Sequence, residues 1–339
     1  MQINFEHHQS AHCENGVTSN LLRYEGFDKI TEPLAFGIGS GLFFIYIPLL
    51  KVNNAPAISY RTMPGLIFKR TCKSLGIEVV RKKFSSPEKA QKFLDSCLNN
   101  NQPVGCQVGV YYLVYFPKAY RFHFNAHNLV VYGKENDTYL ISDPVMETPT
   151  TLTSYELERV RFAKGALAPK GQIYYPKITK EISDDKIRQA IKEGVKRNVR
   201  DMLYIPGPFA GVSGIRYTAN KILQWRAKYG EKIAGNYLAQ LVRMQEEIGT
   251  GGGGFRFIYA AFLQQAFQYH AIDELPKISE QFTKAGDMWR SAAVQAAGIF
   301  KGRLTADADY QNMADFLNQI ADIEKMAFKD LQKIKWQKN

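Results

Sequence analysis

The sequence lacks the features that would place it in several common protein classes. Its four cysteines, at positions 13, 72, 97 and 106, form no C-x-x-C pair, so neither a disulfide framework nor a zinc site is expected. No stretch reaches the roughly 18 consecutive apolar residues that a membrane-spanning helix needs. Residues 1–9 contain no basic segment followed by an apolar one, so no secretion signal is predicted and we expect a cytoplasmic protein.

Acidic residues are fewer than basic ones. The chain has 44 Lys and Arg against 32 Asp and Glu, a net charge of +12. Its densest basic runs, 69–70 and 81–83, are short, and no nucleic-acid-binding motif accompanies them. No binding to nucleic acid is therefore predicted. The basic surplus favours a solvated surface that could attract an acidic protein partner.

The two halves of the chain differ in pattern. With 339 residues, two domains are expected. Up to about residue 175 the chain alternates short β-type runs with two helical patterns. We predict strands over 41–50, 103–115, 126–133, 138–143 and 171–176, and helices over 64–75 and 86–98. The polar residues 134–137 have the length of a hairpin turn between two of these strands.

From residue 183 onward the apolar residues follow a helical period. We predict helices over 186–202, 214–229, 232–247, 255–270, 277–300 and 310–335. The chain is therefore predicted to be an α+β domain, residues 1–178, followed by a mostly α-helical domain, residues 179–339.

Three residues of the first half have the types and the order of a thiol catalytic centre. Cys13 precedes a predicted helix, and the N-terminus of a helix favours the thiolate and can hold an oxyanion. His127 begins a strand and Asp143 ends the next one, so a hairpin would bring the general base and its orienting carboxylate together. Each residue alone also has a plain structural interpretation: a buried cysteine, a strand histidine and an Asp-Pro turn. The order Cys, His, Asp is that of papain-like enzymes.

The sequence also resembles a known family. His12-Cys13, the segments 36–44 and 127–133, and Asp143-Pro144 resemble the family of butirosin-biosynthesis protein H. Its members have a papain-like N-terminal domain related in plan to bacteriocin-processing cysteine peptidases. The segment 249–257 resembles the uncharacterised helical domain that often follows it.

This resemblance implies an activity and roles for the three residues. The named member of the family moves an acyl group from an acyl carrier protein thioester to an amine of an aminoglycoside. The resemblance implies that Cys13 takes the acyl group, His127 is the base and Asp143 orients it. It implies an acyl carrier protein as partner, whose phosphopantetheine arm is part of the donor, and no dissociable cofactor. Papain-like enzymes usually carry a glutamine several residues before the nucleophile as oxyanion donor, and Gln9 is the candidate here.

Two glycine-rich segments are candidates for substrate binding. Gly37 and Gly39 precede a predicted strand and lack the GK[ST] of a nucleotide loop, so we expect a tight turn or a close approach to the substrate. Gly251 belongs to a glycine run directly before a predicted helix whose first turn carries Arg256, and a phosphate or phosphopantetheine arm could bind at the N-terminus of that helix. A flexible connection between two helices is the alternative for that run.

The leading hypothesis is thus an acyltransferase of secondary or lipid metabolism that forms a Cys13 acyl-enzyme and passes the acyl group to a small-molecule amine or hydroxyl. A peptidase or amidase with the same triad is one alternative, and a non-catalytic binding or scaffold protein is another. The histidines at positions 7, 8, 12 and 123 show no spacing typical of metal ligands, so no metal is predicted.

Overall fold

The structure of the protein is a computed structural model that describes residues 2–52, 54–178 and 181–336. The chain forms two compact units, the first made of Met1–Ala35 and Ile67–Ile182 and the second of Phe36–Leu66 and Ser183–Asn339. Residues 36–66 therefore belong with the helical unit, although the sequence pattern assigns them to the α+β domain. The predicted start of the second domain, residue 179, lies outside the described residues.

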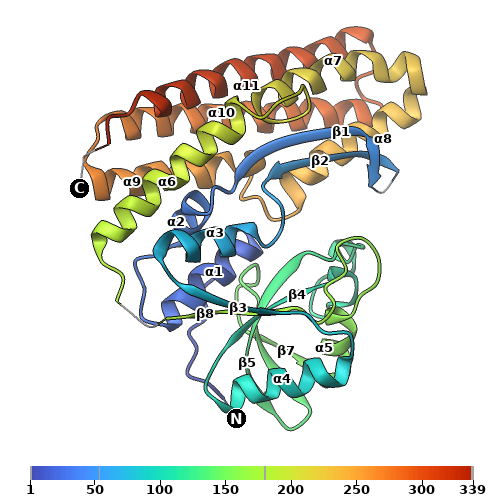
Figure 1. The fold of residues 1–339 in the computed structure, drawn as a ribbon. Coiled ribbons are helices and arrows are strands. Elements are labelled where there is room, and N and C mark those ends of the chain that lie inside the picture. The colour runs from blue at the N-terminus through green and yellow to red at the C-terminus, as the bar shows by residue number, and fades with distance from the viewer. Residues whose placement is uncertain (1, 53, 179–180, 337–339) are drawn as a thin grey trace. The chain divides into compact units, whose positions relative to one another are not determined.

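An antiparallel sheet forms the centre of the first unit (Figure 1). Its strand order is β3-β8-β4-β5-β6-β7. The strands are β3 (Glu78–Lys82), β4 (Val104–Val108), β5 (His127–Glu135), β6 (Thr138–Ser142), β7 (Thr150–Thr153) and β8 (Ile173–Lys177). Strands β5 and β6 form the predicted hairpin, with Val130 opposite Ser142. In β5 every residue from His127 to Gly133 is buried, which is typical of a strand covered on both faces.

Helices cover this sheet. They are α1 (Cys13–Tyr24), α3 (Leu66–Leu75), α4 (Pro87–Asn99) and α5 (Ser154–Arg161), with 3₁₀ turns at Val110–Tyr112 and Lys118–Tyr120. The predicted cap of α4 is confirmed, because the Ser86 hydroxyl accepts the Lys89 N–H and Pro87 occupies the first turn. Helix α1 packs against β5 and buries Val17 and Leu21.

The second unit is mostly helical, as predicted. Its elements are β1 (Leu42–Val52), β2 (Ala55–Arg61), α6 (Asp184–Leu203), α7 (Gly211–Tyr229), α8 (Glu231–Val242), α9 (Arg256–His270), α10 (Glu274–Phe300) and α11 (Asp307–Lys333). A π-helical turn, Arg243–Glu247, follows α8, and a 3₁₀ turn, Gly253–Phe255, precedes α9. The short helix α2 (Glu32–Ile38) spans the division between the units. Helix α11 lies beside both α7 and α10 (Figure 1).

Aromatic packing joins the β1–β2 hairpin to the helices of the second unit. The rings of Phe44 and Tyr60 contact the buried Trp289 ring at centroid distances of 5.8 and 5.1 Å. Such contacts bury large apolar areas, so they stabilise the hairpin within the helical unit.

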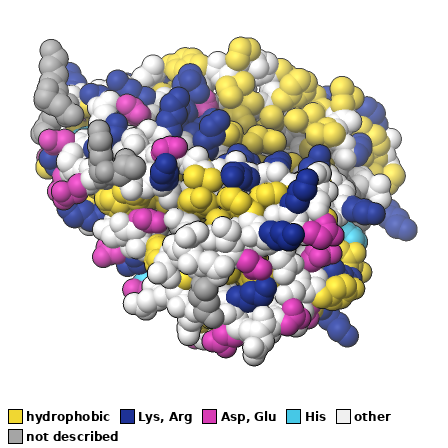
Figure 2. All heavy atoms as spheres, turned by 60° about the horizontal axis from the view of Figure 1, so that its bottom comes forward, with side chains coloured by type: hydrophobic (Ala, Val, Ile, Leu, Met, Phe, Trp, Pro, Cys, Tyr) yellow, Lys and Arg dark blue, Asp and Glu magenta, His cyan; other side chains and the backbone are white. Residues whose placement is uncertain are grey.

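Positive charge is distributed over the face of the molecule that Figure 2 shows. Figure 2 shows Lys and Arg side chains across the viewed face, interspersed with acidic, polar and apolar ones. This distribution is that of a solvated surface, as the short basic runs suggest. Within the described part of the chain, no helix is long and apolar enough to cross a bilayer.

Candidate active site

Cys13 is the first residue of α1, so the helix predicted to follow it is present and includes it. His12 caps the helix: its backbone is extended and its Nδ1 atom accepts the Asn15 N–H at 3.4 Å. The Glu32 carboxylate accepts the N–H groups of Ala11 and His12 and so holds the chain just before the cysteine. The Cys13 side chain is buried at the positive end of the helix dipole.

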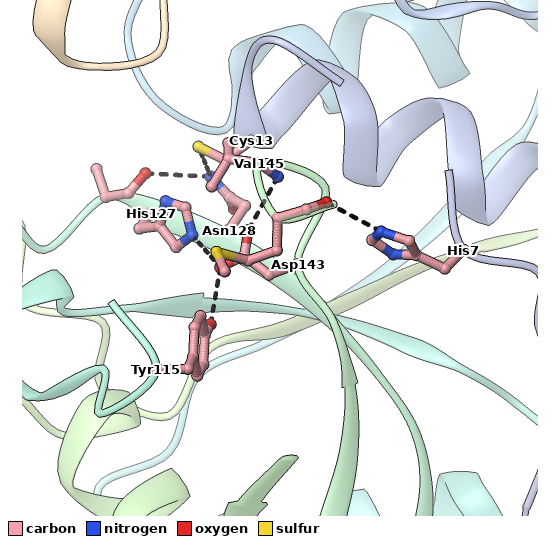
Figure 3. Close-up of polar contacts among 9 residues, drawn as sticks. His7, Cys13, Tyr115, His127, Asn128, Asp143 and Val145 are labelled. Atoms are coloured by element: carbon pink, nitrogen blue, oxygen red, sulfur yellow. Dashed lines mark hydrogen bonds and ion pairs between the residues drawn. The ribbon is translucent and has the colours of Figure 1, made fainter. Parts of the chain in front are cut away.

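The β5–β6 hairpin brings His127 and Asp143 together. His127 opens β5, and Asp143 follows the last residue of β6. The His127 Nε2 atom lies 2.7 Å from Asp143 Oδ2, and both side chains are buried. On its other side the His127 ring lies beside the Cys13 sulfur, and each of these two groups shifts the pKa of the other. Figure 3 shows the His127 ring between the sulfur and the carboxylate. The structure thus joins all three predicted residues in one site.

Asp143 receives three hydrogen-bond donors. Besides His127, the Tyr115 hydroxyl donates to Oδ2 at 2.7 Å, and the Val145 N–H donates to Oδ1 at 3.2 Å (Figure 3). Burial and the neighbouring carboxylate raise the pKa of Tyr115 well above its ordinary value, so the hydroxyl stays a donor. Asp143 is therefore held in one orientation and fixes the orientation of the imidazole.

Cys13 is electrostatically unlike the other cysteines. Burial alone would raise the pKa of its thiol, but the imidazoles of His127 and His12, through charge and hydrogen bonds, hold it well below its ordinary value. Burial raises the pKa of Cys72 to about 12, that of Cys106 to about 11, and that of Cys97 as well. Cys13 is the thiol that is prepared to ionise, and the other three are inert at neutral pH.

His127 is the acid that pairs with the Cys13 thiolate. Burial would lower its pKa, but the Asp143 carboxylate and the Cys13 sulfur raise it to about 10. A lowered thiol pKa beside a raised imidazole pKa describes a thiolate–imidazolium pair at neutral pH. Such a pair supplies a nucleophile and a proton donor for attack on an acyl carbon.

Asn128, rather than Gln9, provides the side-chain amide next to the nucleophile. Gln9 is exposed on the segment before α1. The Nδ2 atom of Asn128, the residue after the catalytic histidine, lies 3.8 Å from Cys13 Sγ and is within hydrogen-bonding range of the sulfur. The prediction of Gln9 as the oxyanion donor receives no support from its position.

The first glycine segment serves packing. Gly37 lies inside helix α2, where an added Cβ would come within 2.1 Å of the Phe262 ring. The missing side chain therefore allows the helix to approach α9. Gly39 is buried in the turn that leads to β1. The expected turn is present at Gly39, but Gly37 is a close-packing position in the second unit.

The second glycine segment, around Gly251, forms a hydrogen-bonded turn. Residues 251–255 all have positive φ, and the Thr250 hydroxyl donates to Gln245 O and accepts the Gly252 N–H. Gly251 lies on the exposed side of this turn. The expectation of a flexible connection is thus corrected to a hydrogen-bonded one.

Arg256 follows this turn but points into the core. Its side chain is fully buried, and its guanidinium makes two hydrogen bonds to Glu324, at 2.8 and 2.9 Å, and a third to Gly254 O. Trp289 Nε1 donates to the same carboxylate at 2.9 Å. This geometry corrects the predicted phosphate-binding role, because the guanidinium is already paired and shielded from solvent.

Two further histidines of the first unit, His7 and His123, make structural contacts. His7 binds Ser142 Oγ and Met146 O at 2.7 and 3.1 Å, and His123 stacks on Tyr111. In the described ranges, no group of three or more His, Cys, Asp or Glu side chains is arranged to hold a metal ion.

Comparison with known proteins places these features in a class and then in a family. The helix-borne cysteine with a histidine and an aspartate from a later sheet is the papain-like arrangement. The family model described as "Butirosin biosynthesis protein H, N-terminal" matches residues 12–144, and "Domain of unknown function (DUF4872)" matches residues 155–331. The chain belongs to this two-domain family of butirosin-biosynthesis protein H-like proteins.

More distant comparisons add little. No curated protein matches the sequence significantly. A solved structure described as a putative C39-like peptidase from Bacillus anthracis is 16% identical, with a TM-score of 0.36, over 53% of this chain and 100% of that one. A likeness of this size supports no conclusion about activity.

Sequence reasoning missed the residues that hold the triad. Tyr115 belongs to an aromatic run that looks like core, and nothing local links it to Asp143. Asn128 had a weak signal, because it is a polar residue in an apolar strand directly after His127. His12 had a similar signal as the neighbour of Cys13.

Proposed function

We propose that the protein is a cysteine-dependent acyltransferase, which takes an acyl group from a carrier protein thioester and passes it to an amine or hydroxyl of a small molecule. The observation that carries the proposal is the buried cluster at the start of α1, in which His127 is hydrogen-bonded to Asp143 and lies beside Cys13. The family description, which refers to butirosin biosynthesis, favours transfer over peptide cleavage.

The chemistry follows from the thiolate–imidazolium pair. The Cys13 thiolate attacks the thioester carbonyl, and the tetrahedral intermediate collapses to acyl-Cys13 while the carrier thiol leaves with the proton of His127. The acceptor amine then attacks acyl-Cys13 and gives its proton to His127, and Cys13 leaves as a thiolate. Asp143 keeps its hydrogen bond to His127 in both steps and so holds the imidazole in place.

The net charge of the protein suits a carrier protein as donor. A carrier protein delivers its acyl group on a phosphopantetheine arm, so the enzyme needs no cofactor of its own for this reaction. Carrier proteins are usually acidic, and the chain has a net charge of +12, so electrostatic attraction would speed their encounter.

A thioester probe tests the proposal. The full chain is mixed with an acyl-pantetheine thioester, and intact mass and peptide mapping follow acylation. We expect one acyl group on Cys13, none on the Cys13→Ala variant, and unchanged acylation of the matched Cys106→Ala variant, which lacks an inert thiol. A small primary amine, for example an amino sugar, is then added.

Release of the acyl group separates the candidates. Faster loss of acyl-Cys13 with amine than in water, together with formation of the amide, supports the transferase. Equal loss with and without acceptor would instead support the peptidase or amidase. Absence of both acylation by the thioester and alkylation by iodoacetamide would support a non-catalytic role.

A further inference from the structure

The side chain of Asn128 lies between the catalytic strand and the nucleophile. It is buried in β5, next to His127, and its Nδ2 atom is 3.8 Å from Cys13 Sγ (Figure 3). A hydrogen bond to sulfur is longer than one to oxygen, and it is strongest when the sulfur is ionised. This contact involves neither His127 nor Asp143, so the described triad does not account for it.

Two neighbours determine which end of the amide faces the sulfur. Nδ2 of Asn128 lies 3.1 Å from the backbone oxygen of Ala126, and a carbonyl can only accept. Oδ1 lies 2.7 Å from the Tyr174 hydroxyl. Burial, together with nearby Glu14 and Cys13, raises the pKa of Tyr174 well above its ordinary value, so that hydroxyl donates. The amide therefore presents an N–H donor, and not its oxygen, to Cys13.

The fold makes room for this arrangement. Tyr174 lies on β8 opposite Gly105 of β4, and an added Cβ at Gly105 would come within 2.5 Å of the Tyr174 ring. The Tyr174 ring occupies the space that a side chain at Gly105 would fill. The same ring contacts the Phe68 ring at a centroid distance of 4.6 Å. Packing thus directs the hydroxyl toward Asn128 Oδ1.

We propose that Asn128 is the side-chain donor that stabilises negative charge on the Cys13 sulfur, and that Tyr174 is the positioning residue that orients it. The inference deepens the proposed function, because the same sulfur carries negative charge before it attacks the donor and again when it leaves acyl-Cys13. Asn128 thus favours the reactive thiolate and the departure of the thiolate in the second step.

The test is the pH dependence of Cys13 alkylation by iodoacetamide, measured by peptide mass spectrometry on the full chain. We expect Asn128→Ala to raise the midpoint of the alkylation profile by about one pH unit, the effect of one charge-assisted hydrogen bond. Tyr174→Phe should raise it by a smaller amount, because the donor remains but loses its orientation. Both variants should also slow release of the acyl group to an amine.

Asn20→Ala is the matched control. Asn20 is a buried asparagine of the same unit whose Nδ2 donates to His8 O, and its loss should leave the alkylation midpoint unchanged. Circular dichroism checks that each variant folds. If Asn128→Ala does not fold, the alkylation midpoint of Tyr174→Phe tests the inference instead. An unchanged midpoint in the folded variants overturns the inference. A shifted midpoint in a protein that no thioester acylates would instead overturn the proposed transferase and leave the role of Asn128 intact.

Discussion

Replacing Asp143 by asparagine tests the catalytic centre most directly. The change keeps the size of the side chain but removes its charge and one of its two acceptor oxygens. In the structure, the two oxygens of Asp143 receive His127 Nε2, the Tyr115 hydroxyl and the Val145 N–H. An amide has one oxygen for these three donors, so its NH₂ group must face at least one of them.

The size of the effect follows from these contacts. If the amide oxygen takes the place of Oδ2, which has two donors at 2.7 Å, the amide nitrogen faces the Val145 N–H and one hydrogen bond is lost. The buried imidazolium also loses its counter-charge, so the thiolate–imidazolium pair is less populated. Together these losses are worth about 2–3 kcal/mol. Acylation of Cys13 at neutral pH should therefore slow by roughly 30- to 150-fold.

The assay is the rate of acyl-Cys13 formation from an acyl-pantetheine thioester, followed by rapid quenching and intact mass. Asp95→Asn is the matched control, because Asp95 also accepts a tyrosine hydroxyl, that of Tyr139 at 2.6 Å, and pairs with Lys134. It has no part in the cluster of Asp143, His127 and Cys13. The reasoning would be refuted if Asp143→Asn acylated within threefold of the unmodified protein, or if Asp95→Asn were slowed as much.

Three further outcomes are expected. Tyr115→Phe removes one donor from Asp143 and should slow acylation roughly tenfold, without changing the melting temperature enough to explain the loss. Alkylation of Cys13 should remain fast well below pH 9, because the pKa of its thiol is lowered. The rate of acyl transfer should fall as the pH rises through about 10, where His127 loses its proton. An alkylation rate with the pH dependence of an ordinary thiol would contradict this. Glu324→Ala leaves the buried Arg256 unpaired and should destabilise the second unit by about 3–5 kcal/mol, a fall of roughly 10 °C in calorimetry, whereas a change below 2 °C would exclude the buried pair as a stabilising feature.

The sequence by itself determined the long helices of the second unit, the hairpin that carries His127 and Asp143, and the choice of Cys13 as nucleophile. Helical periods predicted every long helix of the second unit, and Ser86 with Pro87 predicted the start of α4. These features depend on residues three or four positions apart, so a local pattern records them. The hairpin between 126 and 143 has the same local character, because its turn is short. That short turn is enough to predict that the histidine and the aspartate lie side by side.

Only the tertiary structure decided which side chains support that chemistry. Asn128 reaches Cys13 across 115 positions, Tyr174 reaches Asn128 across 46, and Tyr115 reaches Asp143 across 28. Pairing over such separations depends on how the sheet and α1 pack, which no local pattern records. Arg256 illustrates the same point, since its partner Glu324 lies 68 positions away.

Cys13 is thus both predicted and reinterpreted. Its type, its helix and its order relative to His127 and Asp143 can be read from the sequence. Its low pKa cannot, because burial alone would raise that pKa and only the imidazoles placed around it lower it. Local patterns determine which groups are available, and packing determines which of them share one low-dielectric site where their charges act on each other.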